Sequence, residues 1–304
     1  MAGEVLSAPF TEAKVKEESQ DPVYLRIRDL VYQACGIYHS EEKLYLLVSA
    51  CKRRINASAG QASTGREYLE LLTSPSKRTA ELRELMNEVT IGETCLFRSQ
   101  PQLNALHNVI LPELMSERGK FGMKRIRVWS AGCSTGEEPY SISIAVAETP
   151  SFATGWNIEI LATDISRQAV ARAVRGVYPR RSIANLQPSQ IAAYFTPDGE
   201  EFEVKPAIRN KVLFVVMNLV QCLYLGRMDC IFCMNVLIYF SDERREQLIR
   251  GFYDCLEPGG YLMLGHSETL GNIPVKFEKI VFEDFMLYRK PSGINDTSDF
   301  GSQG

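Results

Sequence analysis

The stretch of residues 130–141 constrains this chain more than any other part of its sequence. It follows a short apolar run and precedes a helical pattern. A strand that enters a helix through a short turn with glycines, here Gly132 and Gly136, is typical of a cofactor site, because glycine lets the backbone approach a ligand closely. Glu137 and Glu138 would repel a pyrophosphate and attract a cation or an amine. The sequence therefore predicts a positively charged cofactor rather than a nucleotide phosphate.

The composition is that of an ordinary soluble globular protein. The 304 residues are 45% hydrophobic and 23% charged, and a net charge of -3 gives no global attraction to nucleic acid or to a membrane. No apolar run approaches the ~18 to 20 residues that span a bilayer, and the N-terminus is too acidic and polar for a signal peptide. We expect a cytoplasmic protein.

Eight cysteines are scattered along the chain, mostly within apolar patterns, which indicates reduced and buried thiols. Cys230 and Cys233 have the spacing of many metal and redox sites. They lie within a predicted strand, where residues three apart point to opposite faces. We therefore expect no shared redox role for them and no metal.

The N-terminal part, residues 21–90, has a helical pattern throughout. Asp21, with a proline after it, begins the first helix, and Gly36 ends it. Three more helices follow, and the third of the four begins at a capping box formed by Thr64 and Glu67. The sequence predicts a small helical bundle.

From about residue 125 the pattern changes to strands separated by helices. Strands are expected at residues 125–131, 158–163, 228–234 and 261–265, and helices near 137–148, 167–175 and 242–256. This alternation predicts a doubly wound α/β domain with a parallel sheet. Residues 277–289 are expected to add a terminal antiparallel hairpin, and residues 200–216 a small antiparallel insertion.

The predicted organisation has five parts. They are a flexible tail at residues 1–20, an N-terminal helical domain at 21–90, a linker with a connecting helix at 91–124, an α/β domain at 125–290 with a β insertion at about 196–216, and a flexible tail at 291–304.

Ligands of doubly wound folds lie at the carboxyl ends of the strands, so each loop after a strand is a candidate wall of one site. Asp164 follows the second strand, 28 residues after Gly136, roughly where dinucleotide-binding folds place the acid that holds a ribose (about 20 residues on). Asp164 could instead cap the next helix, a role that Ser166 could share. His266 in the last loop could be a general base, although a lone loop histidine is more often structural.

Five motifs carry a resemblance to a known family. They are Glu-Thr-Cys-Leu-Phe-Arg at residues 93–98, Ser-Thr-Gly-Glu-Glu-Pro-Tyr-Ser at 134–141, Ala-Thr-Asp-Ile at 162–165, Asn-Val-Leu-Ile-Tyr-Phe at 235–240 and Gly-His-Ser-Glu at 265–268. On these motifs the chain resembles the chemotaxis receptor methyltransferase (CheR) family over about residues 25–289. The resemblance implies a Rossmann-like class I methyltransferase fold, S-adenosylmethionine as cofactor and S-adenosylhomocysteine as product. It also implies chemotaxis adaptation through methyl esters on chemoreceptor glutamates.

The resemblance, together with the glycine turn, assigns a set of cofactor-binding residues. They are Thr94, Arg98, Gly132, Glu137, Asp164, Asn218, Leu219 and Asn235. Within this set, Glu137 would meet the cofactor's amino group, Asp164 its ribose, and the segment of Asn218 and Leu219 its adenine.

Arg98 and Tyr239 are the residues that the resemblance places nearest the reacting carboxylate. Glutamate has a reference pKa of about 4.3, so it is ionised at neutral pH and needs no general base. Arg98 would orient a carboxylate, and the Tyr239 hydroxyl could donate a hydrogen bond. Positioning would matter more than acid-base chemistry.

Two positions depart from the family pattern. Gly92 stands where the family usually has asparagine, and Met234 where it usually has arginine, whose loss removes up to five donors and a charge. A cofactor-binding regulatory module with little turnover, or a methyltransferase for another carboxylate, is therefore an alternative. A nicotinamide dehydrogenase is disfavoured by the acidic turn.

Lys52, Arg53 and Arg54 lie on or beside one predicted helix whose apolar residues face inward. Their charges form either a docking surface for the cytoplasmic helical region of an acidic chemoreceptor or an ordinary solvated face. In some family members the small β insertion binds a receptor tail. The insertion of this chain is short, so the sequence does not decide whether it binds one. We expect a monomer, with no nucleic-acid partner and no direct membrane insertion.

Overall fold

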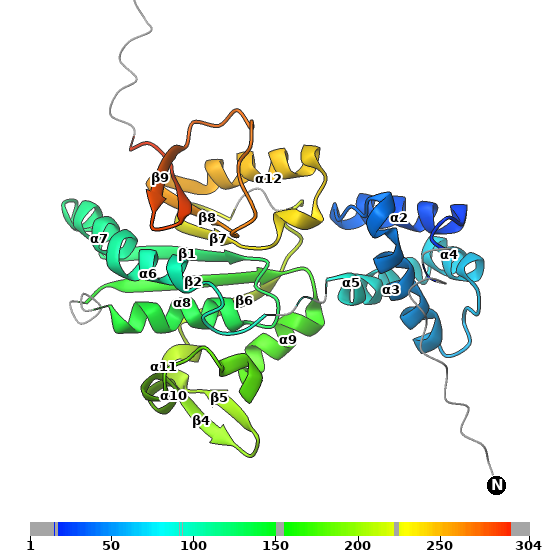
Figure 1. Cartoon of the computed structure of the whole chain (residues 1–304), viewed down its shortest axis with the longest axis horizontal. Coiled ribbons are helices and arrows are strands. Elements are labelled where there is room, and N and C mark those ends of the chain that lie inside the picture. Colours follow the sequence, from blue (N-terminus) through cyan, green and yellow to red (C-terminus); the bar gives the residue numbers. More distant parts are fainter. Residues whose placement is uncertain are drawn as a thin grey trace, which may run out of the picture. The chain divides into compact units, whose positions relative to one another are not determined.

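The computed structural model describes residues 15, 18–90, 92, 94–149, 155–221 and 225–292. It divides into two compact units, Met1–Ile91 and Gly92–Gly304, drawn in blue to cyan and in cyan to red in Figure 1. The predicted tails at residues 1–20 and 291–304 lie almost entirely outside the described residues. None of the described helices has the length and apolar character needed to cross a bilayer.

The first unit is helical, as its sequence pattern predicts. Its described elements are α2 (Pro22–Cys35), η1 (Glu41–Lys43), α3 (Leu44–Ala57), α4 (Gly65–Thr73) and α5 (Arg78–Val89). Asp21 caps α2 by accepting a hydrogen bond from the Val23 amide at 2.8 Å, and Gly36, at a φ of 77°, ends it. Thr64 caps α4 by accepting from the Glu67 amide. These local caps explain why the sequence predicted where α2 and α4 begin.

The second unit contains a seven-stranded sheet. Its strands are β1 (Arg125–Ala131), β2 (Asn157–Asp164), β6 (Val212–Val216), β7 (Met228–Cys233), β8 (Leu256–Leu264), β9 (Glu278–Phe282) and β10 (Phe285–Arg289). They lie in the order β6-β2-β1-β7-β8-β10-β9. The first five are parallel, and β9 and β10 form an antiparallel hairpin beside β8. The doubly wound α/β prediction, with its terminal hairpin, is confirmed.

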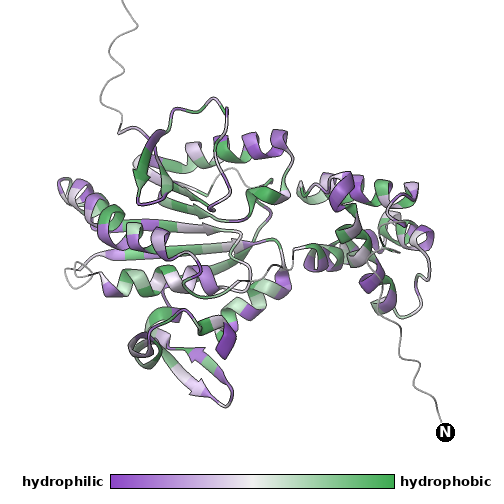
Figure 2. Ribbon diagram, in the orientation of Figure 1, coloured by the Kyte–Doolittle hydropathy of each residue, from purple (hydrophilic) through white to green (hydrophobic). Residues whose placement is uncertain are grey.

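Helices cover the sheet and close two apolar cores. The helices are α6 (Gln100–Ala105), the π-helix η2 (Leu106–Ile110), α7 (Leu111–Gly119), α8 (Glu137–Glu148), α9 (Arg167–Arg175) and α12 (Asp242–Cys255). One core joins the sheet to α6, α7 and α8, and the other joins it to α12. Along α12 hydrophilic turns alternate with hydrophobic ones (Figure 2), and the buried residues are those that meet the sheet.

Cys230 and Cys233 lie on opposite sides of β7. Cys230 belongs to the core with α8, and Cys233 to the core with α12. Both are buried free thiols, and burial raises the pKa of each well above its ordinary value. The prediction that they face away from each other is confirmed.

The small antiparallel sheet differs from its predicted extent, residues 196–216. It contains β3 (Val177–Pro179), β4 (Phe195–Asp198) and β5 (Glu201–Val204), accompanied by η4 (Arg180–Ile183), α10 (Pro188–Tyr194) and α11 (Pro206–Arg209). The run that starts at Val212 is instead β6, which pairs in parallel with β2 in the large sheet. The prediction was wrong there because an uninterrupted apolar run is typical of parallel strands, and α11 separates it from β5.

Candidate cofactor and substrate site

The loops after β1, β2, β7 and β8 meet at the carboxyl edge of the large sheet. The amides of Gly132 and Cys133 both donate to the Thr163 carbonyl, at 2.8 and 2.9 Å. A Cβ on Gly132 would lie 2.5 Å from a methyl group of Val236, in the loop after β7. A Cβ on Gly136, at a φ of 97°, would lie 2.8 Å from Ala173 of α9. These glycines therefore make room for neighbouring protein segments, not only for a ligand as their spacing suggested.

Asp164 ties three segments together at the end of β2. Its Oδ2 accepts from the Ser134 amide at 2.9 Å, its Oδ1 accepts from the Ser166 amide at 2.8 Å, and its carbonyl accepts from the Met217 amide at 2.8 Å. The helix cap of α9 is Ser166, whose hydroxyl accepts from the Ala169 amide. Asp164 is thus not the cap, and a carboxylate retains lone pairs for further donors such as hydroxyl groups.

Two more carboxylates lie in the first turn of α8, where Glu137 is buried and Glu138 is half-buried. Glu137 accepts a hydrogen bond from the Thr135 hydroxyl at 2.6 Å, and Glu138 accepts one from the Ser130 hydroxyl at 2.7 Å. Burial raises the pKa of Glu137 and Asp164, and it raises the pKa of Glu138 to about 7. Among the described residues, no basic side chain forms an ion pair with any of the three. Carboxylates that are largely shielded from water and form no ion pair fit a cationic ligand with amine and hydroxyl groups.

Glu268 connects the loops that follow β7 and β8. Its Oε2 accepts from the amides of Asn235 and Gly265, both at 2.7 Å, and its Oε1 accepts from the Ile238 amide at 3.3 Å. Asn235 is in the left-handed region, at a φ of 59°. The sequence shows Glu268 within a motif, but the motif gives it no role. Glu268 is the site residue that the sequence reasoning missed, whereas Glu138 was expected, with Glu137, to attract a cation or an amine.

Arg98 and Tyr239 share the neighbourhood of these carboxylates. Arg98 is exposed, and its charge lowers the pKa of Glu138 and of Tyr239 against the larger effect of burial. The charges of Glu268 and Asp164 raise the pKa of Tyr239 further. Tyr239 ends η5 (Leu237–Tyr239), with 36% of its surface exposed. The structure therefore brings Arg98, Tyr239 and the buried acids into one electrostatic neighbourhood.

Thr94 and Arg98 belong to a loop near the start of the second unit, which packs against α8 and η4. The Leu96 amide donates to the Ser182 carbonyl at 2.8 Å, and the Phe97 amide donates to the Ser141 hydroxyl at 2.9 Å. Thr94 is half-buried in this loop, while Glu93 of the same motif lies outside the described residues.

The segment with Asn218 and Leu219 lies beside Asp164 through the Met217 amide. Asn218 Oδ1 accepts from the Val220 amide at 3.1 Å, which holds the turn. Leu219 is buried in the core with α12, so it offers apolar surface rather than a donor. Met234 is buried in the core with α8, and Gly92 is exposed, where a Cβ would lie 3.6 Å from the Tyr239 hydroxyl.

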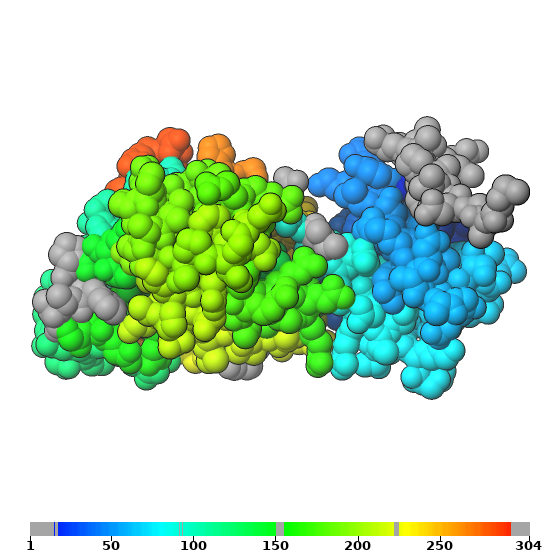
Figure 3. All heavy atoms as spheres, turned by 90° about the horizontal axis from the view of Figure 1, so that it is seen from below, coloured from blue at the N-terminus to red at the C-terminus, as the bar shows by residue number. Residues whose placement is uncertain are grey.

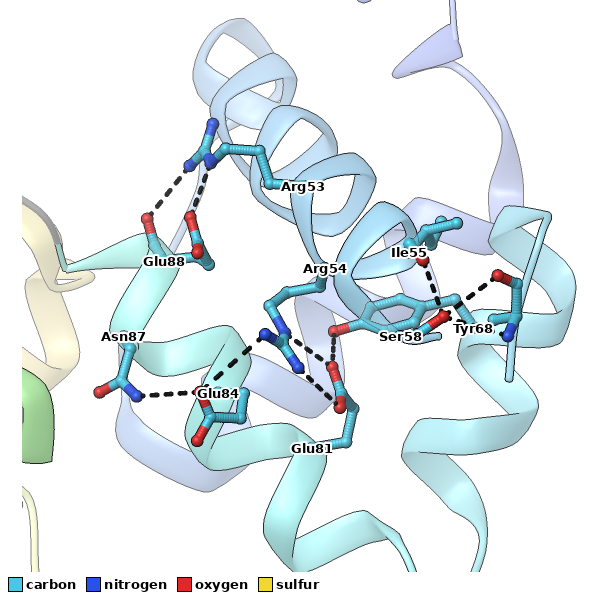
Figure 4. Close-up of polar contacts among 10 residues, drawn as sticks. Arg53, Arg54, Ile55, Ser58, Tyr68, Glu81, Glu84, Asn87 and Glu88 are labelled. Carbon is cyan, nitrogen blue, oxygen red and sulfur yellow. Dashed lines mark hydrogen bonds and ion pairs between the residues drawn. The ribbon is translucent and has the colours of Figure 1, made fainter. Parts of the chain in front are cut away.

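In the first unit, the three cations expected to dock a partner are paired with acids. The pairs are Lys52–Glu18, Arg53–Glu88 and Arg54–Glu81. Arg54 binds both carboxylate oxygens of Glu81, at 2.9 and 3.1 Å, and its side chain is 15% exposed (Figure 4). This geometry gives them a structural role inside the unit, and docking through them stays a prediction.

Comparison with known proteins identifies the family. The model of the "CheR methyltransferase, SAM binding domain" family matches residues 92–286. The chain is 36% identical to chemotaxis protein methyltransferase 2 of Vibrio cholerae, over 92% of this chain and 97% of that protein. It is 35% identical to chemotaxis protein methyltransferase 1 of Pseudomonas aeruginosa, over 86% and 95% of the two chains. It is 33% identical to the chemotaxis protein methyltransferase of Escherichia coli, over 84% and 87%. The chain belongs to the CheR family of S-adenosylmethionine-dependent chemotaxis methyltransferases.

Proposed function

We propose that this enzyme methylates glutamate side chains of chemoreceptors, giving glutamate methyl esters and S-adenosylhomocysteine. The observation that carries the proposal is the exposed Arg98 guanidinium, whose charge acts on both the Tyr239 hydroxyl and the Glu138 carboxyl. A guanidinium can hold a carboxylate through two parallel hydrogen bonds. On a helical receptor the acid would be glutamate rather than aspartate, because glutamate has the higher helix propensity.

The chain's own residues have to hold two partners in line and keep water away. When bound, S-adenosylmethionine supplies an electrophilic methyl group on a positively charged sulfur. Arg98 would orient the substrate carboxylate, and the Tyr239 hydroxyl, whose pKa is raised by burial, stays protonated and can donate to it. A glutamate carboxylate is ionised at neutral pH, so no residue has to remove a proton. Proximity and exclusion of water then supply most of the rate.

The cofactor would be held by the acids and by the loops that they fix. Glu137 would accept hydrogen bonds from its ammonium group, and Asp164 from its ribose hydroxyls. The apolar surface of Leu219, next to Asn218, would lie against its adenine. Thr94, Gly132 and Asn235 would complete the pocket from the other loops.

The alternative of a regulatory module with weak or no turnover rests on Gly92 and Met234. Met234 is buried among apolar residues, so this position offers no donor to the pocket. Calorimetry with S-adenosylmethionine and a methyl-transfer assay on receptor fragments separate the two functions. Binding without transfer to any carboxylate would favour the regulatory module.

Replacement of Arg98 tests the proposal directly. We expect Arg98→Ala to lower the kcat of methyl transfer by about 100-fold or more, because a preorganised group that holds the reacting carboxylate is lost. Arg98 is exposed, so the melting temperature should stay the same. Arg98→Lys keeps the charge without the planar fork and should recover only part of the rate. Near-normal transfer of labelled methyl by Arg98→Ala would overturn the assignment.

A further inference from the structure

One stretch of the second unit is unusually rich in arginine. Residues 165–197 contain five arginines and no aspartate or glutamate, in a chain whose net charge is -3. Three lie on α9 and two on η4: Arg167, Arg172, Arg175, Arg180 and Arg181. All five are exposed. Figure 3 shows this part of the chain, in green to yellow-green, on the near face.

The charges of this stretch are not neutralised within the described part of the protein. Arg180 stacks on the Phe202 ring, 5.2 Å from its centroid. The other four form no ion pair with a described acid, whereas Arg53 and Arg54 of the first unit are paired (Figure 4). An unpaired set of guanidinium groups is available to a partner. We call the five residues the arginine band.

The arginine band borders the candidate site on two sides. On α9, the Ala173 carbonyl accepts from the Tyr140 hydroxyl at 2.8 Å, and Ala173 fills the space above Gly136. On η4, Ser182, next to Arg181, accepts the amide of Leu96 at 2.8 Å, and Leu96 lies two residues before Arg98. A partner on the band is therefore close to the residue proposed to hold the target carboxylate.

The arginine band includes one exposed apolar side chain, and two of its arginines are one helical turn apart. Val174 is 54% exposed among the arginines of α9. Arg172 and Arg175 are three residues apart on α9, so they lie about one turn, or ~5 Å, apart. Carboxylates one turn apart on a partner helix would match them, and an apolar side chain would meet Val174.

We propose that the arginine band docks an acidic, amphipathic helix of the protein that is methylated. This inference rests on the proposed function for the identity of the partner, but its chemistry stands on charge complementarity. It places a docking surface on α9 and η4, and docking through Lys52, Arg53 and Arg54 stays a separate prediction.

The test measures binding of a probe helix to full-length variants. The probe is a labelled synthetic helical peptide with glutamates one turn apart and leucines on the other face. Arg172→Glu/Arg175→Glu reverses two charges of the band, and Arg66→Glu/Arg83→Glu makes the same charge change on exposed residues of α4 and α5. Fluorescence anisotropy gives the Kd at about 0.15 M ionic strength.

We expect the band variant to raise the Kd of the probe by about tenfold or more, and the control pair to raise it by less than about twofold. Arg172→Gln/Arg175→Gln should give a smaller increase, because it removes charge without repulsion. Cofactor affinity from calorimetry should be the same in all variants. Equal weakening by both pairs, no weakening by the band variant, or tighter binding of anionic vesicles or RNA than of the peptide would overturn the inference.

Methyl transfer to a receptor fragment is measured separately. A band variant with a raised KM and an unchanged kcat would support docking of the substrate itself. If the unmodified enzyme transfers no methyl to receptors but the probe still depends on the band, the proposed function fails while the docking surface stands.

Discussion

Glu268 holds together two loops of the candidate site. One buried carboxylate accepts three backbone amides from two loops, and one of those loops carries Tyr239. Gly265 is required beside it, because a Cβ there would lie 2.6 Å from Glu268 Oε2. Hydrogen bonds from amides to a charged acceptor are among the stronger ones in proteins. We therefore regard Glu268 as a positioning residue for Asn235 and Tyr239.

Glu268→Gln should lower kcat by about tenfold while the Kd of the cofactor changes by less than about threefold. The amide nitrogen of glutamine cannot accept from the Ile238 amide, so the loop before Tyr239 loosens and the reacting groups are misplaced. Steady-state kinetics and calorimetry measure the two effects.

Asp229→Asn is the matched control for that prediction. Asp229 is also buried, accepts from the Arg127 amide at 2.8 Å and pairs with Arg118, but it lies at the amino end of β7. This variant should lose stability without loss of kcat. If both variants lose kcat in proportion to stability, Glu268 only stabilises the fold.

Residue roles were predictable where the contact is local. Ser166 and Asp164 are two residues apart, and the sequence named both as candidate caps. The partners of Arg53 and Arg54 lie 35 and 27 residues away on another helix. Glu268 and Asn235 are 33 residues apart. Pairing across elements decides these roles, and one sequence carries no signal for it.

At the scale of elements, the turn between β1 and α8 depends on close packing with α9. Its Gly136 has a φ of 97°, and a Cβ would meet Ala173 and the Tyr178 hydroxyl at 2.8 Å. The Tyr178 hydroxyl donates to the Thr135 carbonyl at 2.7 Å. A side chain at this position would therefore separate the turn from α9 and β3.

Gly136→Ala should destabilise the second unit by about 2 kcal/mol more than Gly199→Ala. Gly199 also has a positive φ, 60°, but a Cβ there would meet nothing within 4 Å. The control therefore carries the backbone strain without the steric overlap. Urea unfolding followed by tryptophan fluorescence measures both changes. Equal destabilisation would show that packing against α9 contributes nothing at this turn.

Elements with local start and stop signals were the predictable ones. β1 and α8 have the bounds that the sequence predicted, and the terminal hairpin was found. β6 was misassigned, because membership of a sheet is set by the pairing partner and not by the strand's own residues. β6 is therefore the one of the five parallel strands that the sequence did not assign to the large sheet.

At the scale of the whole molecule, the two units contain groups whose pKa values are shifted in opposite directions. In the first unit, burial lowers the pKa of His39 from 6.5 to about 4, and its Nδ1 has no hydrogen-bond partner. In the second unit, burial raises the pKa of Glu138 from 4.5 to about 7. A difference in pKa between folded and unfolded states makes stability depend on pH.

The two signs follow from which state binds the proton. Below about pH 6.5 the unfolded chain protonates His39 while the folded unit does not, so stability falls as the pH drops towards 4. Between about pH 7 and 4.5 the folded unit protonates Glu138 while the unfolded chain does not, so stability rises as the pH drops. From pH 7.5 to 5.5 each effect is on the order of 1 to 2 kcal/mol.

We therefore expect a lower pH to destabilise the first unit and to stabilise the second. The midpoints of the two unfolding transitions should then shift in opposite directions as the pH falls. Both tryptophans, Trp129 and Trp156, lie in the second unit, so tryptophan fluorescence follows that unit alone, while far-ultraviolet circular dichroism follows both. Glu138→Gln should reduce the stabilisation seen by fluorescence, because Glu137 and Asp164, whose pKa values are also raised, still contribute to it, and it should leave the other transition unchanged. A single transition with the same midpoint by both probes at each pH would show that the units do not unfold separately, and movement of both midpoints in one direction would contradict the assigned signs.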